Sequence, residues 1–212
     1  MGNPFTETGE EKVARESWIA VQADLRKDLS EITRHYGFSP LDQREVDNAP
    51  QPWNAAAREE APDGTVGFYV YYDGRWTLIY DPWLILWEAA SIHAWVSERF
   101  AALVLTGVFK PSADAFGYGE FEHGDMRRWV FRQQHVVTQD TGNPAPWEQE
   151  IFTGEVGDMG PRLRKHWGIY PERAEEVISI FAAIPGMRQR RSWFPWLPWR
   201  RRAERRIGTQ TY

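Results

Sequence analysis

The sequence contains no cysteine, so disulfide bonds, thiolate metal ligands and a cysteine nucleophile are excluded. It also lacks a long apolar run, because PWLILW and AALVLTGVF are far shorter than the ~20 residues that a membrane-spanning helix needs. The first twenty residues are acidic and lack the apolar region of a signal peptide. These absences favour a reducing compartment, and we expect a cytoplasmic protein.

Signatures of catalysis are missing as well. The five histidines fall on separate expected elements, and neither H-E-x-x-H nor G-x-S-x-G occurs. The glycine-rich stretch 154–166 lacks the spacing of a phosphate-binding P-loop, and we expect it to form a short helix with a solvated basic face. The sequence therefore predicts no metal and no cofactor, and favours a protein that is not an enzyme.

The richest polar cluster consists of Glu120, Glu122, His123 and Asp125. Carboxylates and imidazole are the usual acid–base groups and metal ligands. In a strand, however, Glu120 and Glu122 share one face while His123 points to the other. The three side chains would not converge on one ligand without help from elsewhere in the fold.

Cross-strand ion pairs are the favoured interpretation of these glutamates. A two-residue turn would place Glu122 opposite Arg127, whereas a three-residue turn would place Glu120 opposite Arg128. The alternative is a small enzyme in which the fold brings His135 or His93 to the carboxylates of Glu120, Glu122 and Asp125. His93 itself lies beside an apolar helical stripe, which favours a hydrogen-bonded boundary residue over a catalytic base.

The N-terminal third is predicted to be helical and then irregular. A helix over residues 8–37 is indicated by a T-x-x-E capping box at its start and by apolar residues at steps of three and four, namely Trp18, Val21, Leu25, Leu29, Ile32 and Tyr36. Four prolines without a sustained period indicate a linker or wrapped loop over 39–66.

Residues 67–186 are expected to form a sheet with helices. The pair Asp73-Gly74 between aromatic and β-branched flanks predicts a hairpin with a two-residue turn. A helix is expected from Asp81-Pro82 to about Phe100, a central strand in AALVLTGVF, a second hairpin turning at Gly124-Asp125, and a last helix from Pro171. We therefore predict one α+β domain over 8–186, with about five largely antiparallel strands in the order α-β-β-α-β-β-β-α.

Gly117 and Gly119 lie on the strand face opposite the glutamates. Their missing side chains would allow a helix, Trp129 or Phe131 to approach the sheet closely. We interpret them as packing positions, and the alternative is room for a ligand on an exposed face.

The segment 187–212 is a basic tail whose core reads RRSWFPWLPWRRR. Residues 188–206 hold eight arginines against one glutamate, a local charge of +7, and because the whole chain carries −5 the remainder carries −12. The two prolines favour polyproline II geometry, in which every third residue shares one ridge. The expected binding residues are the ridge and its flanking arginines: Trp193, Trp196, Trp199, Arg190, Arg191, Arg200, Arg201 and Arg202.

Residues 190–202 resemble the Trp/Pro/Arg-rich cationic host-defence peptides of the cathelicidin type in their alternation of tryptophan, proline and flanking arginine. The resemblance covers thirteen of 212 residues and implies contact with an anionic membrane surface. The tail can instead pack on the acidic body, bind a protein partner or complete an oligomer. Nucleic acid is disfavoured because the acidic body would repel it.

Together these features predict a non-enzymatic binding protein, similar to a bacterial immunity or adaptor protein, whose acidic face covers a basic protein partner. A peripheral membrane contact through the tail is the second candidate. The sequence does not indicate the oligomeric state.

Overall fold

The computed structural model describes residues 16–45, 65–174 and 176–183, and the tail 187–212 lies outside this range. Nine strands form one sheet in the order β2-β9-β3-β4-β1-β5-β6-β7-β8, and every neighbouring pair is antiparallel. The strands are β1 Glu16–Val21, β2 Ser39–Glu45, β3 Thr65–Tyr72, β4 Thr77–Tyr80, β5 Val104–Lys110, β6 Ala115–Glu122, β7 Asp125–Gln133, β8 Val136–Thr141 and β9 Glu176–Ala183.

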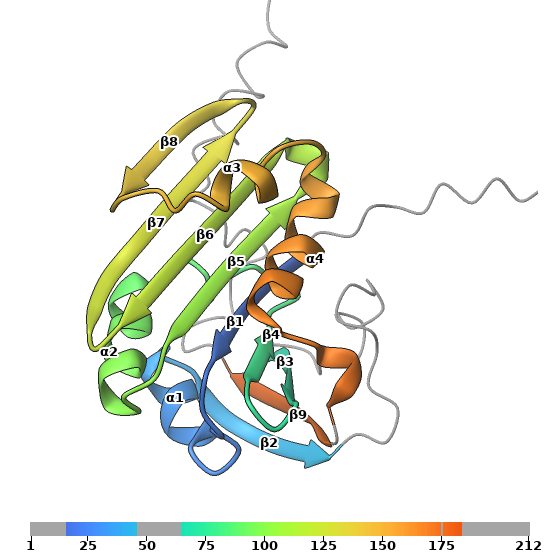
Figure 1. Ribbon diagram of the computed structural model, residues 1–212. Coiled ribbons are helices and arrows are strands. Elements are labelled where there is room, and N and C mark those ends of the chain that lie inside the picture. Colours follow the sequence, from blue (N-terminus) through green and yellow to red (C-terminus); the bar gives the residue numbers. More distant parts are fainter. Residues whose placement is uncertain (1–15, 46–64, 175, 184–212) are drawn as a thin grey trace, which may run out of the picture.

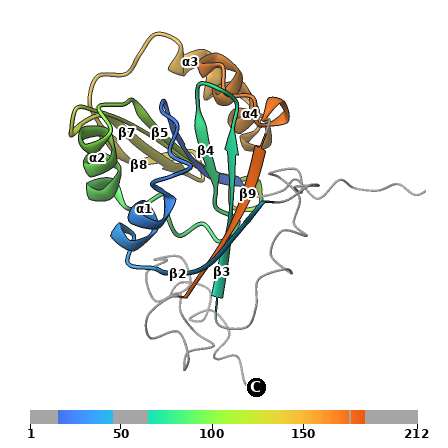
Figure 2. The same ribbon diagram turned by 90° about the horizontal axis from the view of Figure 1, so that it is seen from below.

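Helices cover both faces of this sheet. They are α1 Leu29–His35, α2 Ala90–Arg99, α3 Glu148–Ile151 and α4 Val156–Trp167, with 3-10 turns at Pro111–Ala113 and Pro171–Arg173. Figure 1 shows α3 and α4 over one face of the sheet, and Figure 2 shows the sheet curving around α1 and α2 on the other face. Two apolar cores result, one on each side of the central strands.

The predicted fold class of about five strands in a mixed α-β order is wrong, because nine strands share the sheet. The expected helix over 8–37 contains β1 and only a short helix, α1. Residues of β1 alternate between the two cores, with Trp18 in one and Ile19 in the other. A strand that is buried on both faces is apolar throughout, and such a run also matches helical spacing.

The expected C-terminal helix after Pro171 is also wrong, because Glu176–Ala183 forms β9 between β2 and β3. Ile178, Ile180 and Ala182 alternate toward the core around α1, which is the period of a strand. The predicted linker over 39–66 begins with β2 and ends at β3, and residues 46–64 lie outside the described range.

Both predicted hairpins and the central strand are confirmed. β5 is buried on both faces and pairs with β1 and β6. The first hairpin joins β3 and β4 by a four-residue loop instead of the predicted two, because Asp73 Oδ1 accepts hydrogen bonds from the N–H groups of Arg75 and Trp76 at 3.0 and 2.7 Å. The helix expected from Pro82 starts later, at Ala90.

Candidate binding edge

The carboxylates singled out in the sequence lie around the β6–β7 hairpin. The turn is formed by His123 and Gly124, one residue earlier than predicted, and both have positive φ angles of 53° and 84°. Glu122 and Asp125 pair directly across it, and Glu122 Oε2 lies 3.6 Å from Arg127 Nε. These half-exposed groups form an ordinary surface ion pair.

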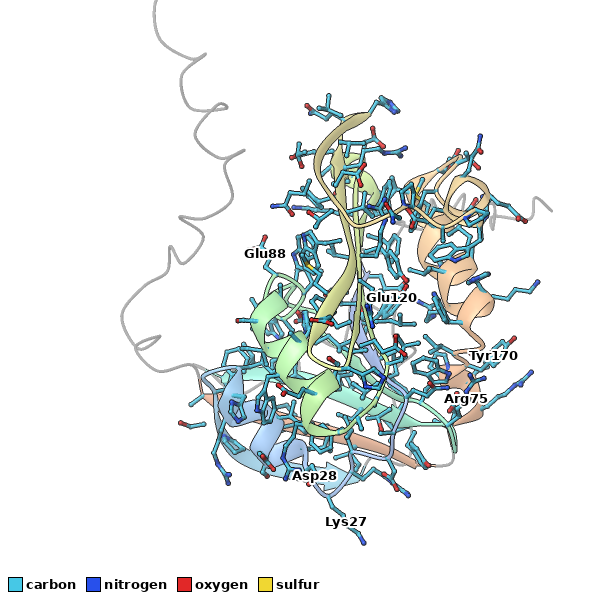
Figure 3. All side chains as sticks on the ribbon, turned by 60° about the vertical axis from the view of Figure 1, so that its left-hand side comes forward. Lys27, Asp28, Arg75, Glu88, Glu120 and Tyr170 are labelled. Carbon is cyan, nitrogen blue, oxygen red and sulfur yellow. The ribbon has the colours of Figure 1, made fainter. Side chains whose placement is uncertain are left out.

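Glu120 is separated from this pair. Its Oε2 accepts a hydrogen bond of 2.8 Å from the Tyr118 hydroxyl, and it lies on the α4 side of the sheet in Figure 3. It stands opposite Arg128 in register because a bulge after Glu120 leaves Arg127 as the extra residue. The register that places Glu120 opposite Arg128 is therefore present, but the Arg128 side chain binds other carboxylates. The register that places Glu122 opposite Arg127 is wrong, because Glu122 faces Asp125 and reaches Arg127 only through its side chain.

His135 lies at the far end of β7, in the turn to β8. Its side chain is 85% exposed, and its Nε2 lies 3.3 Å from Asp114 Oδ2. The hairpin turn at Glu122 and the turn at His135 are at opposite ends of β7, so the fold does not bring the expected acid–base groups together. Within the described residues, no group of three or more histidine or acidic side chains can hold a metal ion.

Arg128 forms a polar cluster that sequence reasoning missed. Its side chain is 5% exposed and donates to Glu148 through Nε at 2.9 Å and through Nη2 at 2.8 Å. Nη1 contacts the Asp140 carboxylate and donates to the Thr141 carbonyl at 3.0 Å. The hydrogen bonds that Arg128 donates to Glu148 raise the pKa of the guanidinium, which is therefore always charged. The cluster fastens α3 and the end of β8 to β7.

The β8 edge, residues 136–141, is the most open part of the described structure. β8 is the last strand of the sheet, pairs only with β7 among the described strands, and is exposed at all six positions. Figure 1 shows the β7–β8 hairpin projecting past the helices. Two of the three large hydrophobic side chains exposed in the described part lie on this edge, Val136 at 60% and Val137 at 51%, and the third, Met126 at 41%, lies near the start of β7.

An aromatic stack stiffens the sheet beneath this edge. The Trp87 indole lies parallel to Trp129 at 5.2 Å between centroids, and Trp129 Nε1 donates to Gln139 of β8 at 2.6 Å. A Cβ atom on Gly117 would lie 2.6 Å from Trp87, and one on Gly119 would lie 2.6 Å from Trp129. The two glycines are therefore packing positions beneath the indoles, as the sequence indicated.

A second polar group, centred on His93, is buried in the interior. His93 is 0% exposed, its Nδ1 lies 2.8 Å from the Tyr36 hydroxyl, and its Nε2 lies 3.1 Å from the Trp87 carbonyl. Since a carbonyl only accepts, Nε2 donates and Nδ1 accepts the hydroxyl proton. Burial lowers the pKa of His93 to about 4, which makes the ring neutral. His93 is hydrogen-bonded, as predicted, but it lies in the interior and not at the predicted boundary of the core.

Asp81 lies buried near the same group. Its carboxylate accepts hydrogen bonds from the N–H groups of Trp83, Ile85 and Leu86 at 2.6–3.0 Å. Burial raises the pKa of Asp81 to about 6, against the opposing effect of these N–H donors. Asp81 thus fixes the chain that leads into α2, and the group has a structural role.

Comparison with known protein families, with curated proteins and with solved structures gave no match. Among the helices that the structure describes, none has the length and apolar character needed to cross a bilayer.

Proposed function

We propose that this protein is a non-enzymatic binding protein, of the immunity or adaptor kind, that pairs the β8 edge with an extended segment of a protein partner. The observation that carries this proposal is the combination of an open outer strand with the exposed hydrophobic side chains of Val136 and Val137. An open strand offers N–H and C=O groups that a partner strand can complete, while side chains beside it supply specificity.

The composition of β8 supports this role. Edge strands that avoid association carry lysine, proline or inward-pointing charge. β8, with the sequence VVTQDT, has neither lysine nor proline, and its single charge, Asp140, contacts Arg128. The strand is also held firmly, by the Arg128 cluster on one face and by Trp129 on the other. A firm strand loses little conformational entropy when a partner binds.

The charge of the chain supports a basic partner. Outside residues 188–206 the sequence carries −12, which accelerates association with a positively charged protein. We place the protein in the cytoplasm on account of its cysteine-free sequence. Contact of the tail with an anionic membrane is the second candidate location.

The test compares two lysine substitutions, both at exposed valine or methionine positions. Val137→Lys on β8 should reduce capture of the partner from the native cell at least about tenfold, because a charge at the edge opposes strand pairing. Met126→Lys on β7, which is not an outer strand, is the matched control and should retain capture.

Hydrogen exchange supplies the second measurement. With the captured partner added, the amides of residues 136–141 should become protected while those of β5 stay unchanged. Equal capture by Val137→Lys, without protection at β8, would show that the partner binds elsewhere. If Glu120→Gln with Glu122→Gln abolished a turnover reaction of the protein, the enzyme alternative would replace this proposal.

A further inference from the structure

A cluster of aromatic rings and one carboxylate lies on the α4 side of the sheet. Tyr118 and Glu120 belong to β6 and share one of its faces, because side chains alternate along a strand. Trp147 directly precedes α3, and Trp167 is the last residue of α4. Figure 3 shows Glu120 on the side of the sheet that α4 covers. We call these four side chains the Glu120 cluster.

The aromatic rings of the Glu120 cluster stand almost at right angles to one another. The Tyr118 and Trp147 rings are 5.5 Å apart between centroids at an interplanar angle of 79°, and the Trp147 and Trp167 rings are 6.0 Å apart at 84°. The Tyr118 hydroxyl donates a hydrogen bond of 2.8 Å to Glu120 Oε2, and the Trp167 indole lies close to the same hydroxyl. Tyr118 thus joins the carboxylate to both indoles.

Part of the Glu120 cluster is accessible to solvent. Tyr118 is fully buried, and the Phe152 ring packs against it at 5.8 Å between centroids. Glu120, Trp147 and Trp167 are each half-buried. A small ligand can therefore contact the carboxylate and the indoles where they reach the surface, while the buried Tyr118 keeps them in position.

The carboxylate of this cluster has no countercharge of its own. Within the described part of the chain Glu120 forms no ion pair, neither with Arg128 opposite it in the register nor with Lys165 of α4. Arg128 is bound by Glu148 and Asp140 instead. One guanidinium therefore stands against three carboxylates, and this excess of negative charge at a half-buried group favours the binding of a cation.

The indoles and the carboxylate together define the kind of cation that fits. Aromatic faces attract a cation that lies within about 6 Å of the ring centroid, and tryptophan attracts it most strongly. An unmodified ammonium group brings three N–H donors that each need an acceptor. The cluster offers one carboxylate, and one of its oxygens already accepts the Tyr118 hydrogen bond. A fully methylated ammonium group has no N–H donor to satisfy and presents methyl groups to the indoles, so it fits better.

We propose that the Glu120 cluster binds a methylated ammonium group, of the kind carried by choline and by a trimethylated lysine side chain. Trp147 and Trp167 contact its methyl groups, and Glu120 supplies the countercharge. The negative charge of the chain outside residues 188–206 attracts such a cation to the protein. This inference does not depend on the β8 edge, because Glu120 lies on β6, which β7 separates from β8.

A titration with choline tests the proposal on the full-length protein. The indole N–H resonances are followed by NMR and assigned with the variants Trp147→Phe and Trp167→Phe. The matched probe is dimethylbutanol, a neutral alcohol in which a carbon atom replaces the charged nitrogen of choline. Choline should shift the resonances of both indoles to saturation and bind at least about tenfold more tightly than the alcohol. Equal affinity for the two probes, or no shift at either indole, would overturn the proposal.

Two glutamine substitutions on β6 test the countercharge. Glu120→Gln keeps the size of the side chain and an oxygen that accepts the Tyr118 hydrogen bond, but it removes the charge, so choline should bind at least about tenfold more weakly. Glu122→Gln, at the next position on the same face, is the matched control and should retain binding. Unchanged binding by Glu120→Gln would contradict the proposal. Val137→Lys should leave choline binding unchanged, which keeps this test separate from that of the β8 edge.

A peptide probe identifies where the ammonium group comes from. A short peptide with one trimethylated lysine between glycines is titrated in the same way as choline. Tighter binding of the peptide indicates a modified protein side chain, whereas tighter binding of choline indicates a free molecule or a headgroup, and both results support the site. The same peptide with unmodified lysine should bind more weakly than the trimethylated one. Equal binding of the two peptides would show that the methyl groups are not recognised, and the proposal would be wrong.

Discussion

At the scale of single residues, the packing of the sheet depends on the absence of side chains at Gly117 and Gly119. The indoles of Trp87 and Trp129 occupy the space in which Cβ atoms of these glycines would lie. Trp129 and Phe131 of β7 lie on the same face, Trp87 packs on them from the chain before α2, and this stack forms only because β6 has no side chain beneath it. This packing supports the sheet at β6 and β7, and also β8, to which Trp129 donates a hydrogen bond.

Gly119→Val should lower the free energy of unfolding by about 1–3 kcal/mol, because the added methyl groups overlap the Trp129 ring and force the stack apart. Urea unfolding followed by fluorescence measures the change. Met126→Val, at an exposed position on the adjacent strand, is the control and should change stability by less than about 0.5 kcal/mol. A stable Gly119→Val variant would show that the sheet has room at this point.

At the scale of elements, the short helix α3 and the end of β8 are fixed by one side chain. Arg128 reaches Glu148, Asp140 and two backbone carbonyls of the chain between them. Glu148 also accepts a hydrogen bond of 2.9 Å from the N–H of Ala145. A segment with little regular structure is thus ordered by charge-assisted hydrogen bonds.

Arg128→Met should therefore destabilise the protein by about 3 kcal/mol, because it leaves the buried Glu148 carboxylate without its countercharge. The double variant Arg128→Met with Glu148→Leu removes the stranded charge and should recover at least half of that loss. Urea unfolding of the wild type, both single variants and the double variant gives the coupling. A double variant no more stable than Arg128→Met would mean that the cluster acts through its other contacts.

At the scale of the whole molecule, elements distant in the sequence meet on the inside of the curved sheet. Tyr36 follows α1, Asp81 follows β4 and His93 belongs to α2. Asp81 and His93 are fully buried, and the half-buried Tyr36 reaches His93 with its hydroxyl. Desolvation raises the pKa of Tyr36 well above 10, and the nearby Asp81 raises it further. The group links three separate parts of the fold and makes its stability sensitive to pH.

The two titrating groups act in opposite directions. Between pH 6.5 and about 4 the unfolded chain binds a proton at His93 that the folded protein does not, so acid favours unfolding. Asp81 has a raised pKa of about 6, so between this value and about 4 the folded protein binds the extra proton and acid favours folding. The two contributions oppose each other between about pH 6 and 4.

His93→Gln removes the contribution of His93 to the pH dependence of stability and leaves that of Asp81. As the pH falls from 7 to 4, the wild type should lose about 3 kcal/mol relative to this variant, at about 1.4 kcal/mol per unit of the pKa change from 6.5 to about 4. Urea unfolding at several pH values measures the difference, and an NMR titration of the His93 ring checks that it stays neutral above about pH 4. Parallel stability curves for the two proteins would show that His93 titrates as in the unfolded chain.

The sequence by itself determined the features that depend on neighbouring residues. Turn-forming residues flanked by β-branched and aromatic side chains located both hairpins, and a continuous apolar run located β5. These patterns are local, because a turn and its flanks form by short-range hydrogen bonds. The close packing at Gly117 and Gly119 was also indicated, since their strand was identified correctly.

The tertiary structure alone decided the features that depend on distant burial. β1 and β9 are strands because they pair with strands on either side of them. Their apolar spacing alone is also compatible with a helix. The exposed strand β8 has no buried apolar face from which a sequence pattern could predict it. The side chains that hydrogen-bond to Arg128 and His93, Glu148 and Tyr36, come from other elements of the fold. Hydrogen-bond partners across such distances are set by the packing of the sheet, which no short window of sequence contains.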